Sequence, residues 1–255
     1  MSRFEGRRAV ISGGATGIGA AAARRLAAEG AAVAVLDTNA GDGEALVDDL
    51  RRGGASARFT PCDVADVGAV RAAVDAAAGA LGGLDLVFAN AGVGTIVVGG
   101  TVESIEPERW GLAFDVNARG AYALCRAAIP HLRAQGGGAI VMTSSSSAYI
   151  GTGGRPTHAY AATKGALVSL VRAMAASYGP EGIRVNGLAP GLVRTRLTED
   201  ILGDPARREA AIGGVPLRRY ATPEELAACA LFLLSDDASF VTGTVLVADG
   251  GQTIV

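Results

Sequence analysis

Short apolar segments alternate along this chain with longer alanine-rich segments, and this alternation constrains the fold more than any other feature. Runs such as Arg8–Ser12 (RAVIS) and Ala32–Asp37 (AVAVLD) are continuous apolar stretches, as expected of strands buried on both faces of a parallel sheet. Segments such as Gly17–Glu29 instead carry apolar residues every three to four positions, which is the spacing of an amphipathic helix. The alternation predicts an α/β fold with a doubly wound parallel sheet of about seven strands and helices on both faces.

The expected elements follow one another without a break that would divide the chain. The seven expected strands are Arg8–Ser12, Ala32–Asp37, Ala57–Thr60, Leu84–Ala89, Gly138–Thr143, Arg184–Leu188 and Thr244–Val247. The expected helices are Gly17–Glu29, about 42–52, Asp66–Ala80, Pro107 to about Ala134, about 156–178, and one that is capped by Thr222 and ends near Ser235. No repeat or linker interrupts residues 1–255, so we expect a single domain.

Three irregular stretches, 91–106, 144–157 and 190–221, follow the fourth, fifth and sixth expected strands. Ligands of open α/β sheets bind beyond the carboxyl ends of the strands, so these stretches are the expected pocket walls. The longest of them, 190–221, is the expected substrate loop or lid.

Composition excludes several classes of function. The 23 Lys and Arg residues nearly balance the 25 Asp and Glu residues, giving a formal charge of -2, so no basic field favours nucleic acid or anionic lipid as a partner. No run approaches the roughly 18 apolar residues of a membrane span, and the charged start lacks a signal peptide, so a cytoplasmic location is expected. Cys62, Cys125 and Cys229 lie too far apart for a zinc site, so we expect reduced thiols and no metal.

A glycine-rich turn joins the first expected strand to the first expected helix. In a chain with 37 glycines, the spacing GxxxGxG alone would occur about once by chance, so its position carries the argument. There, Gly13 permits a tight turn, Gly17 lets a pyrophosphate approach the helix N-terminus, and Gly19 lets the helix pack on the sheet. Thr16 and Ile18 lie in the same turn. The placement predicts a dinucleotide site.

Asp37 ends the second expected strand, 20 residues after Gly17. A carboxylate at this point can accept hydrogen bonds from the adenosine ribose, whereas it would repel a 2′-phosphate. Neither Thr16 nor Thr38 supplies the cation that such a phosphate requires. The sequence therefore predicts NAD as the cofactor rather than NADP.

Tyr160 and Lys164 lie four residues apart, on one face of an expected helix. Lys164 is the only lysine among the 23 basic residues. A phenol with an ordinary pKa of about 10 needs a nearby cation to act as an acid or base near neutral pH, and Lys164 supplies it. An exposed Tyr/Lys pair without a catalytic role is the alternative interpretation.

These motifs together resemble the short-chain dehydrogenase/reductases, in their single-domain form of approximately 250 residues. The resemblance implies a Rossmann-like fold and covers nearly the whole chain. Its ordered motifs are Ser12–Gly19, Asp37, Cys62-Asp63-Val64, Asn90-Ala91-Gly92, Val116-Asn117, the serine run after the fifth strand, Tyr160–Lys164, Pro190-Gly191 with Thr195, and Asp249-Gly250-Gly251.

The resemblance also implies roles for single residues. Tyr160 would be the acid/base, Lys164 would bind the nicotinamide ribose and lower the tyrosine pKa, and Asn117 would hold a water in a proton relay to the lysine. A helix-interior Asn that bonds the backbone is the alternative for Asn117. The remaining contacts implied are Asp63 and Val64 at the adenine, Asn90, Ala91 and Gly92 beside the cofactor, and Pro190, Gly191, Val193 and Thr195 at the carboxamide.

The serine that would steady the substrate oxygen has two candidates. Counting from the fifth strand gives Ser145, whereas counting back from Tyr160 by the family spacing gives Ser147. We favour Ser145, because strand register fixes a strand-end side chain more firmly than loop length does. Ser145, Ser147 and Tyr160 are the expected substrate contacts. His158 lies nearby, either at the substrate entrance or as a plain loop residue.

The predicted function is an NAD-dependent oxidoreductase that interconverts a secondary alcohol and a ketone on a small molecule. Two alternatives remain: an NADPH-dependent 3-ketoacyl-carrier reductase, which Asp37 disfavours, and a catalytically silent dinucleotide sensor. Arg155, Arg194 and Arg196 could admit a substrate carboxylate, although surface positions are expected. The expected helix at about 156–178 carries alanines around more of its circumference than one face packed on the sheet requires, which indicates an interface. The family resemblance also implies assembly through this helix, so we expect a homotetramer, with a dimer as the alternative.

Overall fold

All seven strands lie in one parallel sheet, as predicted. The computed structural model describes residues 2–151 and 156–255. The strands are β1 (Arg8–Ser12), β2 (Ala32–Asp37), β3 (Ala57–Pro61), β4 (Leu86–Ala89), β5 (Gly138–Thr143), β6 (Ile183–Pro190) and β7 (Val245–Ala248). Their order, β3-β2-β1-β4-β5-β6-β7, reverses direction between β1 and β4, which makes this point the topological switch of a Rossmann-like fold.

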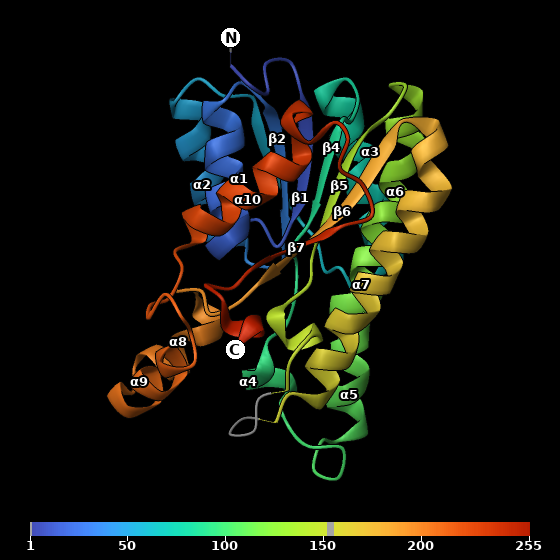
Figure 1. The fold of residues 1–255 in the computed structure, drawn as a ribbon. Helices are drawn as coiled ribbons and strands as arrows, with labels where there is room; N and C mark the ends of the chain where they lie inside the picture. The colour runs from blue at the N-terminus through green and yellow to red at the C-terminus, as the bar shows by residue number, and fades with distance from the viewer. Residues whose placement is uncertain (1, 152–155) are drawn as a thin grey trace.

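Helices cover both faces of the sheet (Figure 1). One face packs against α3 (Val67–Leu81), α6 (Gly120–Ala134) and α7 (His158–Tyr178). The other packs against α1 (Gly17–Ala28), α2 (Ala40–Arg52) and α10 (Pro223–Leu234). Neighbouring strand residues point into opposite cores, for example Val10 into the first and Ile11 into the second. Both residues are fully buried, which explains why the strand sequences are continuously apolar.

The long helix expected from Pro107 to about Ala134 contains a change of winding. It runs as α5 (Pro107–Ala113), a π-helical segment (Phe114–Arg119) and then α6, with Asn117 buried in the π-helical turn. π-helical turns are rare and often occur at functional sites. The winding change therefore marks the part of this helix that faces the cleft described below.

Three short helices interrupt stretches that were expected to be irregular: α4 (Thr95–Val98), α8 (Glu199–Leu202) and α9 (Pro205–Gly213). In Figure 1, α8 and α9 project away from the body of the sheet, and α9 contains no buried residue. α4 and α8 have four residues each and α9 has nine, which is shorter than the window over which helical periodicity can be recognised in a sequence.

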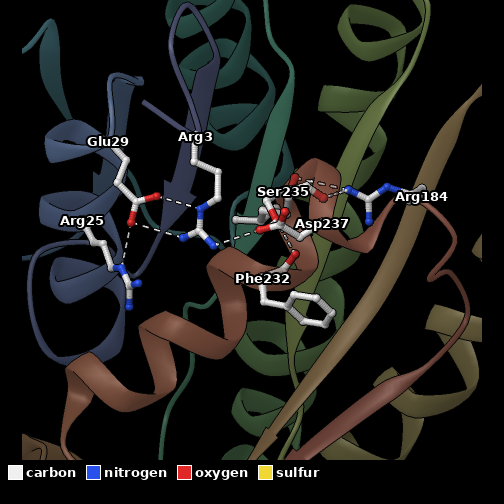
Figure 2. Close-up of polar contacts among 8 residues, drawn as sticks. Arg3, Arg25, Glu29, Arg184, Phe232, Ser235 and Asp237 are labelled. Carbon is white, nitrogen blue, oxygen red and sulfur yellow. Dashed lines mark hydrogen bonds and ion pairs between the residues drawn. The ribbon is translucent and has the colours of Figure 1, made fainter. Parts of the chain in front are cut away.

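A polar network ties down the edge of the molecule at the amino ends of the strands (Figure 2). Arg184, at the start of β6, donates to the carbonyl oxygens of Leu233 at 2.8 Å and Ser235 at 2.9 Å, where α10 ends. These carbonyls lack partners within the helix, and the positive charge also favours a helix C-terminus. Glu29 pairs with Arg3 at 2.7 Å and with Arg25 at 2.9 Å. Hydrogen bonds and ion pairs thus connect the segments at the amino ends of the strands, opposite the carboxyl ends where a ligand site is expected.

No helix in the part of the chain that the structure describes is both long and apolar enough to span a membrane.

Candidate active site

The glycine-rich turn forms the floor of a cleft at the carboxyl ends of β1 and β4. Gly13 and Gly17 adopt φ values of +62° and +57°, a region that favours glycine. A Cβ on Gly13 would lie 2.6 Å from the Cα of Ala91, and one on Gly19 would lie 2.1 Å from the carbonyl oxygen of Gly13. Side chains at these positions would therefore clash with the backbone of the turn. The turn lies at the N-terminus of α1, where backbone N–H groups favour an anionic group such as a pyrophosphate.

The turn after β4 is fastened to this glycine turn. The Ser12 hydroxyl accepts from the backbone N–H groups of Asn90 at 3.2 Å and Ala91 at 3.3 Å. The Asn90 side chain donates to the Gly13 carbonyl oxygen at 2.9 Å and accepts from the Thr143 hydroxyl at 3.1 Å. Asn90 thus joins the ends of three neighbouring strands at the switch point.

Asp37 lines the cleft at the end of β2, and its carboxylate is already oriented by the backbone. One oxygen accepts from the Ala15 N–H at 3.0 Å and the other from the Asn39 N–H at 2.9 Å. Each carboxylate oxygen has a second lone pair, so both can accept a further hydrogen bond from a ribose hydroxyl. Asp63 and Val64, the two expected adenine contacts, lie differently. Val64 lines the cleft together with Cys62, whereas Asp63 does not line it and its carboxylate accepts from the Ala65 N–H at 2.9 Å.

Tyr160, Ser145 and Lys164 meet at the other end of the cleft. The Tyr160 phenol forms a side-chain hydrogen bond with Ser145, at the end of β5. The Lys164 ammonium lies 5.6 Å from the centre of the Tyr160 ring and donates to the Thr143 carbonyl oxygen at 2.8 Å. Ser147 is one turn further along, and its N–H donates to the Ser145 hydroxyl at 3.1 Å. The structure brings Ser145, not Ser147, to the phenol.

Burial dominates the electrostatics of this cluster. Burial lowers the pKa of Lys164 from 10.5 to about 8, because a desolvated ammonium is disfavoured. Burial also raises the pKa of the Tyr160 phenol above its ordinary value, and the hydrogen bond with Ser145 opposes this in part. The expected lowering of the tyrosine pKa by Lys164 is therefore not found in the protein alone, where desolvation has the larger effect.

Asn117 joins the π-helical segment to both the β4 loop and α7. Its amide accepts from the Val93 N–H at 2.8 Å and donates to the Val93 carbonyl oxygen and the Thr163 hydroxyl, both at 3.2 Å. In the alternative interpretation, Asn117 would bond the backbone of its own helix. In the structure it bonds the backbone of Val93, in the loop after β4. Three of its four hydrogen-bonding positions are used, which leaves one acceptor lone pair. A Cβ on Gly92 would lie 3.1 Å from Asn117 Oδ1 and 3.5 Å from Lys164 Nζ, so glycine keeps the space between them open.

The segment after β6 forms the outer wall of the cleft. Pro190, Gly191, Val193 and Thr195 line it as expected, followed by Arg196, Leu197 and Thr198. The Ala221 N–H donates to the Leu192 carbonyl oxygen at 2.9 Å, and the Arg194 N–H donates to the Ala221 carbonyl oxygen at 3.0 Å. These bonds hold the two ends of the segment 192–221 together.

The cleft has a volume of about 360 Å³ and gathers most of the residues that sequence reasoning selected. Those that line it are Gly13, Thr16, Gly17, Ile18, Asp37, Val64, Asn90, Ala91, Gly92, Ser145, Tyr160, Lys164, Pro190, Gly191, Val193 and Thr195. Gly19, Asp63, Asn117 and Ser147 are not among the lining residues. Sequence reasoning missed Cys62 and Val116, although both belong to motifs that it used, and it gave no cofactor role to Arg196.

Two further expectations concern residues around the cleft. His158 is exposed at the start of α7, where its Nδ1 accepts from the Val102 N–H at 2.9 Å and so holds a loop in place. Arg155 lies outside the described residues. Within 2–151 and 156–255, no group of three or more His, Cys, Asp or Glu side chains could hold a metal ion.

A doubly wound sheet, a glycine cradle at its switch point and a Ser/Tyr/Lys cluster beside it define a nucleotide-dependent oxidoreductase. Comparison with known proteins supports this class. A family model described as enoyl-(acyl carrier protein) reductase matches residues 13–253. The chain belongs to the short-chain dehydrogenase/reductase family, whose members use nicotinamide cofactors.

Similar proteins act on small molecules. D-threitol dehydrogenase of Mycolicibacterium smegmatis is 37% identical over 252 residues, which is 99% of this chain and 95% of that protein. A 2,5-dichloro-2,5-cyclohexadiene-1,4-diol dehydrogenase of Sphingobium indicum is 39% identical over 258 residues and all of both chains. The crystal structure of a gluconate 5-dehydrogenase from Burkholderia cenocepacia, in complex with NADP and tartrate, superposes with a TM-score of 0.92. It is 35% identical and covers 100% of this chain and 98% of its own. The chain is therefore an oxidoreductase of small, alcohol-type molecules.

Proposed function

We propose that this protein is an NAD-dependent dehydrogenase that interconverts a secondary alcohol and a ketone, with Tyr160 as the acid/base. The observation that carries the proposal is the contact of the Tyr160 phenol with Ser145 beside the buried Lys164. When bound, the nicotinamide exchanges a hydride with the substrate carbon. The residues of the chain have the remaining tasks, which are to place the alcohol, to move its proton and to stabilise the charge on its oxygen.

In the oxidative direction, the Tyr160 phenolate takes the proton of the substrate hydroxyl while Ser145 donates a hydrogen bond to the developing alkoxide. Lys164 provides the positive charge that favours the phenolate and would contact the nicotinamide ribose. Asn117 has one free acceptor position next to the space that Gly92 leaves open, which suits a water that passes protons toward Lys164. Reduction follows the same path in reverse.

The cofactor preference is for NAD and rests on Asp37. Its two oxygens accept hydrogen bonds from backbone N–H groups, and the residue lines the cleft, where each oxygen keeps a lone pair that could accept from a ribose hydroxyl. A 2′-phosphate there would meet a fixed negative charge, so we expect NADP to bind at least about tenfold more weakly than NAD, or ~1.4 kcal/mol. A similar protein, the gluconate 5-dehydrogenase, was crystallised with NADP, so the preference of this chain for NAD needs a direct test.

The proposed substrate is a small uncharged alcohol. The two cations that line the described part of the cleft already have partners: Lys164 donates to the Thr143 carbonyl oxygen, and Arg196 pairs with Asp42 at 2.8 Å. Leu197 and Val193 provide apolar surface. The threitol and cyclohexadiene diol dehydrogenases act, by name, on an uncharged tetrol and an uncharged diol, which supports the same class.

Calorimetric titration with NAD and NADP, followed by an NAD-linked assay across polyols, cyclic secondary alcohols and hydroxy acids, tests the proposal. Tyr160→Phe should reduce turnover by orders of magnitude and change the Kd for NAD less than about twofold. A variant that keeps substantial turnover would remove Tyr160 from the mechanism. Equal Kd values for the two cofactors would overturn the NAD preference. Binding of NAD without turnover on any alcohol class would favour the silent sensor.

A further inference from the structure

An ion pair crosses from the outer wall of the cleft to α2. Arg196 begins the short 3₁₀ turn Arg196–Thr198, and its Nη1 lies 2.8 Å from Oδ2 of Asp42, in the first turn of α2. Arg196 and Thr16 line both the main cleft and a neighbouring hollow, whose wall includes Asp42. The guanidinium therefore lies on the border of the cleft, near the end where Asp37 is found.

A chain of polar contacts connects this pair with Asp37. Asp42 Oδ2, the atom that binds Arg196, also accepts from the side-chain amide of Asn39 at 2.7 Å. The backbone N–H of Asn39 in turn donates to Asp37 Oδ1 at 2.9 Å. Only Asn39 stands between the carboxylate expected to meet the ribose and the carboxylate that holds Arg196.

The backbone that carries Arg196 is fixed on both sides. A Cβ on Gly17 would lie 3.3 Å from the Thr195 methyl carbon, and one on Gly94 would lie 2.7 Å from Leu197 Cδ2. Thr195 and Thr198 form a reciprocal capping box across the same turn. Because its neighbours are packed on Gly17 and Gly94, Arg196 can select among partners only by moving its side chain.

Within the described lining of the cleft, the cations are Arg196 and Lys164, and Lys164 lies at the catalytic end. Arg24 and Arg194 line the neighbouring hollow but not the cleft, and Arg24 pairs with Asp49 at 3.2 Å. A 2′-phosphate binds strongly only where a cation can form charge-assisted hydrogen bonds with it, and arginine does this best. Arg196 is therefore the described arginine that lines the cleft itself and that a 2′-phosphate there could recruit.

We propose that Asp42 is a second determinant of cofactor specificity: by holding Arg196, it withholds from a 2′-phosphate the cation that such a group would need. The proposal rests on the proposed dinucleotide function and adds to the discrimination by Asp37. The two side chains are 65% and 41% exposed, and ion pairs this exposed contribute little to folding. Breaking the pair should thus change the local charge pattern without unfolding the protein.

The experiment measures the Kd of NAD and of NADP by calorimetry, without turnover. Asp42→Asn should tighten NADP binding by about fivefold and leave NAD within about twofold, because the freed guanidinium can bind the added phosphate. Arg196→Gln alone should change neither Kd by more than about twofold, since Asp42 already occupies this arginine. Asp42→Asn combined with Arg196→Gln should lose the gain. Asp48→Asn, which removes an equal charge from an exposed site on the same helix, is the matched control.

Each other outcome overturns the proposal. If the double variant or Asp48→Asn tightens NADP binding as much as Asp42→Asn does, the effect is one of net charge and not of Arg196. If Arg196→Gln weakens NADP binding in the presence of Asp42, the arginine already reaches the phosphate and is not withheld. If wild type binds NAD but Asp42→Asn leaves the NADP affinity unchanged, the role of Asp42 is refuted while the proposed dinucleotide function stands. If wild type binds neither cofactor, the proposed function fails with it.

Discussion

Lys164 is a buried cation whose cost to folding depends on pH. Its pKa in the folded protein is about 8, below its ordinary 10.5, so unfolding takes up a proton between these pH values. The contribution of Lys164 to stability is therefore lowest below pH 8 and rises as the pH goes from about 8 to about 10.5. A shift of this size corresponds to about 3 kcal/mol.

This prediction is measured by urea unfolding of wild type and Lys164→Met from pH 7 to pH 10. Lys164 is the only lysine, and the difference between the two proteins cancels the titration of tyrosines and cysteines. Loss of the bond to the Thr143 carbonyl oxygen lowers the stability of the variant already at pH 7, so the test is how the difference between the two proteins changes with pH. Wild type should gain stability relative to the variant above pH 8. A difference that stays flat to pH 10 would show that the ammonium is not desolvated.

Ser145 and Ser147 are two residues apart but differ in what they touch. Ser145 bonds the Tyr160 phenol, whereas Ser147 meets the site only through its backbone N–H. Ser145→Ala should raise the barrier by about 2–4 kcal/mol, because it removes a donor to the developing alkoxide. Ser147→Ala, the matched control, should change kcat/KM less than about threefold. The opposite order would assign the substrate contact to the loop serine.

At the scale of whole elements, the π-helical turn at Phe114–Arg119 presents Asn117 to two other segments at once. Asn117→Asp keeps the acceptor for the Val93 N–H but loses both donated bonds and buries a negative charge against the Val93 carbonyl oxygen. We expect a loss of about 3 kcal/mol or more in the free energy of unfolding. Denaturant unfolding would measure this loss, with Asp115→Asn as the control. Asp115 is a partly exposed residue of the same turn, and its ion pair with Arg119 is exposed enough to contribute little to stability. A loss below 1 kcal/mol for Asn117→Asp would contradict a linking role.

The elements differ in how far the sequence determines them. Every strand was predicted to within two residues. A strand buried on both faces leaves a continuous apolar run, as in Ile140–Met142, whereas the edge strand β7 is half-buried but still apolar. The glycine turn was predictable since its backbone demands are local. By contrast, α9 has a capping Asp204 and Pro205 at its start but is only nine residues long and buries none of them, so periodicity over a longer window could not reveal it. The pairing of Arg196 with Asp42 depends on the path of a long loop and has no sequence signal.

The surface of the whole molecule carries two apolar regions on different sides of the sheet. One lies on the outer face of α7 and the neighbouring helices, with small exposed residues on α7 and larger ones on α5 and α6. Its members are Ala162, Ala166, Ala173, Ala176, Trp110, Leu112 and Tyr122. The other lies at the edge strand β7, whose residues are half-buried, and includes Phe232 and the fully exposed Phe240. Two separate regions of this kind suit two different two-fold contacts.

We therefore predict a homotetramer in solution. Four chains of 25.5 kDa give about 102 kDa, which light scattering at micromolar concentration would measure. Ala166→Arg places a long charged side chain where close helix packing is expected, so it should reduce the assembly to dimers of about 51 kDa. Ala206→Arg, on the exposed face of α9, introduces the same side chain away from both regions and should leave the tetramer intact. A wild-type mass near 25.5 kDa would exclude both the tetramer and the dimer, and an unchanged mass for Ala166→Arg would remove the α7 face from the interface.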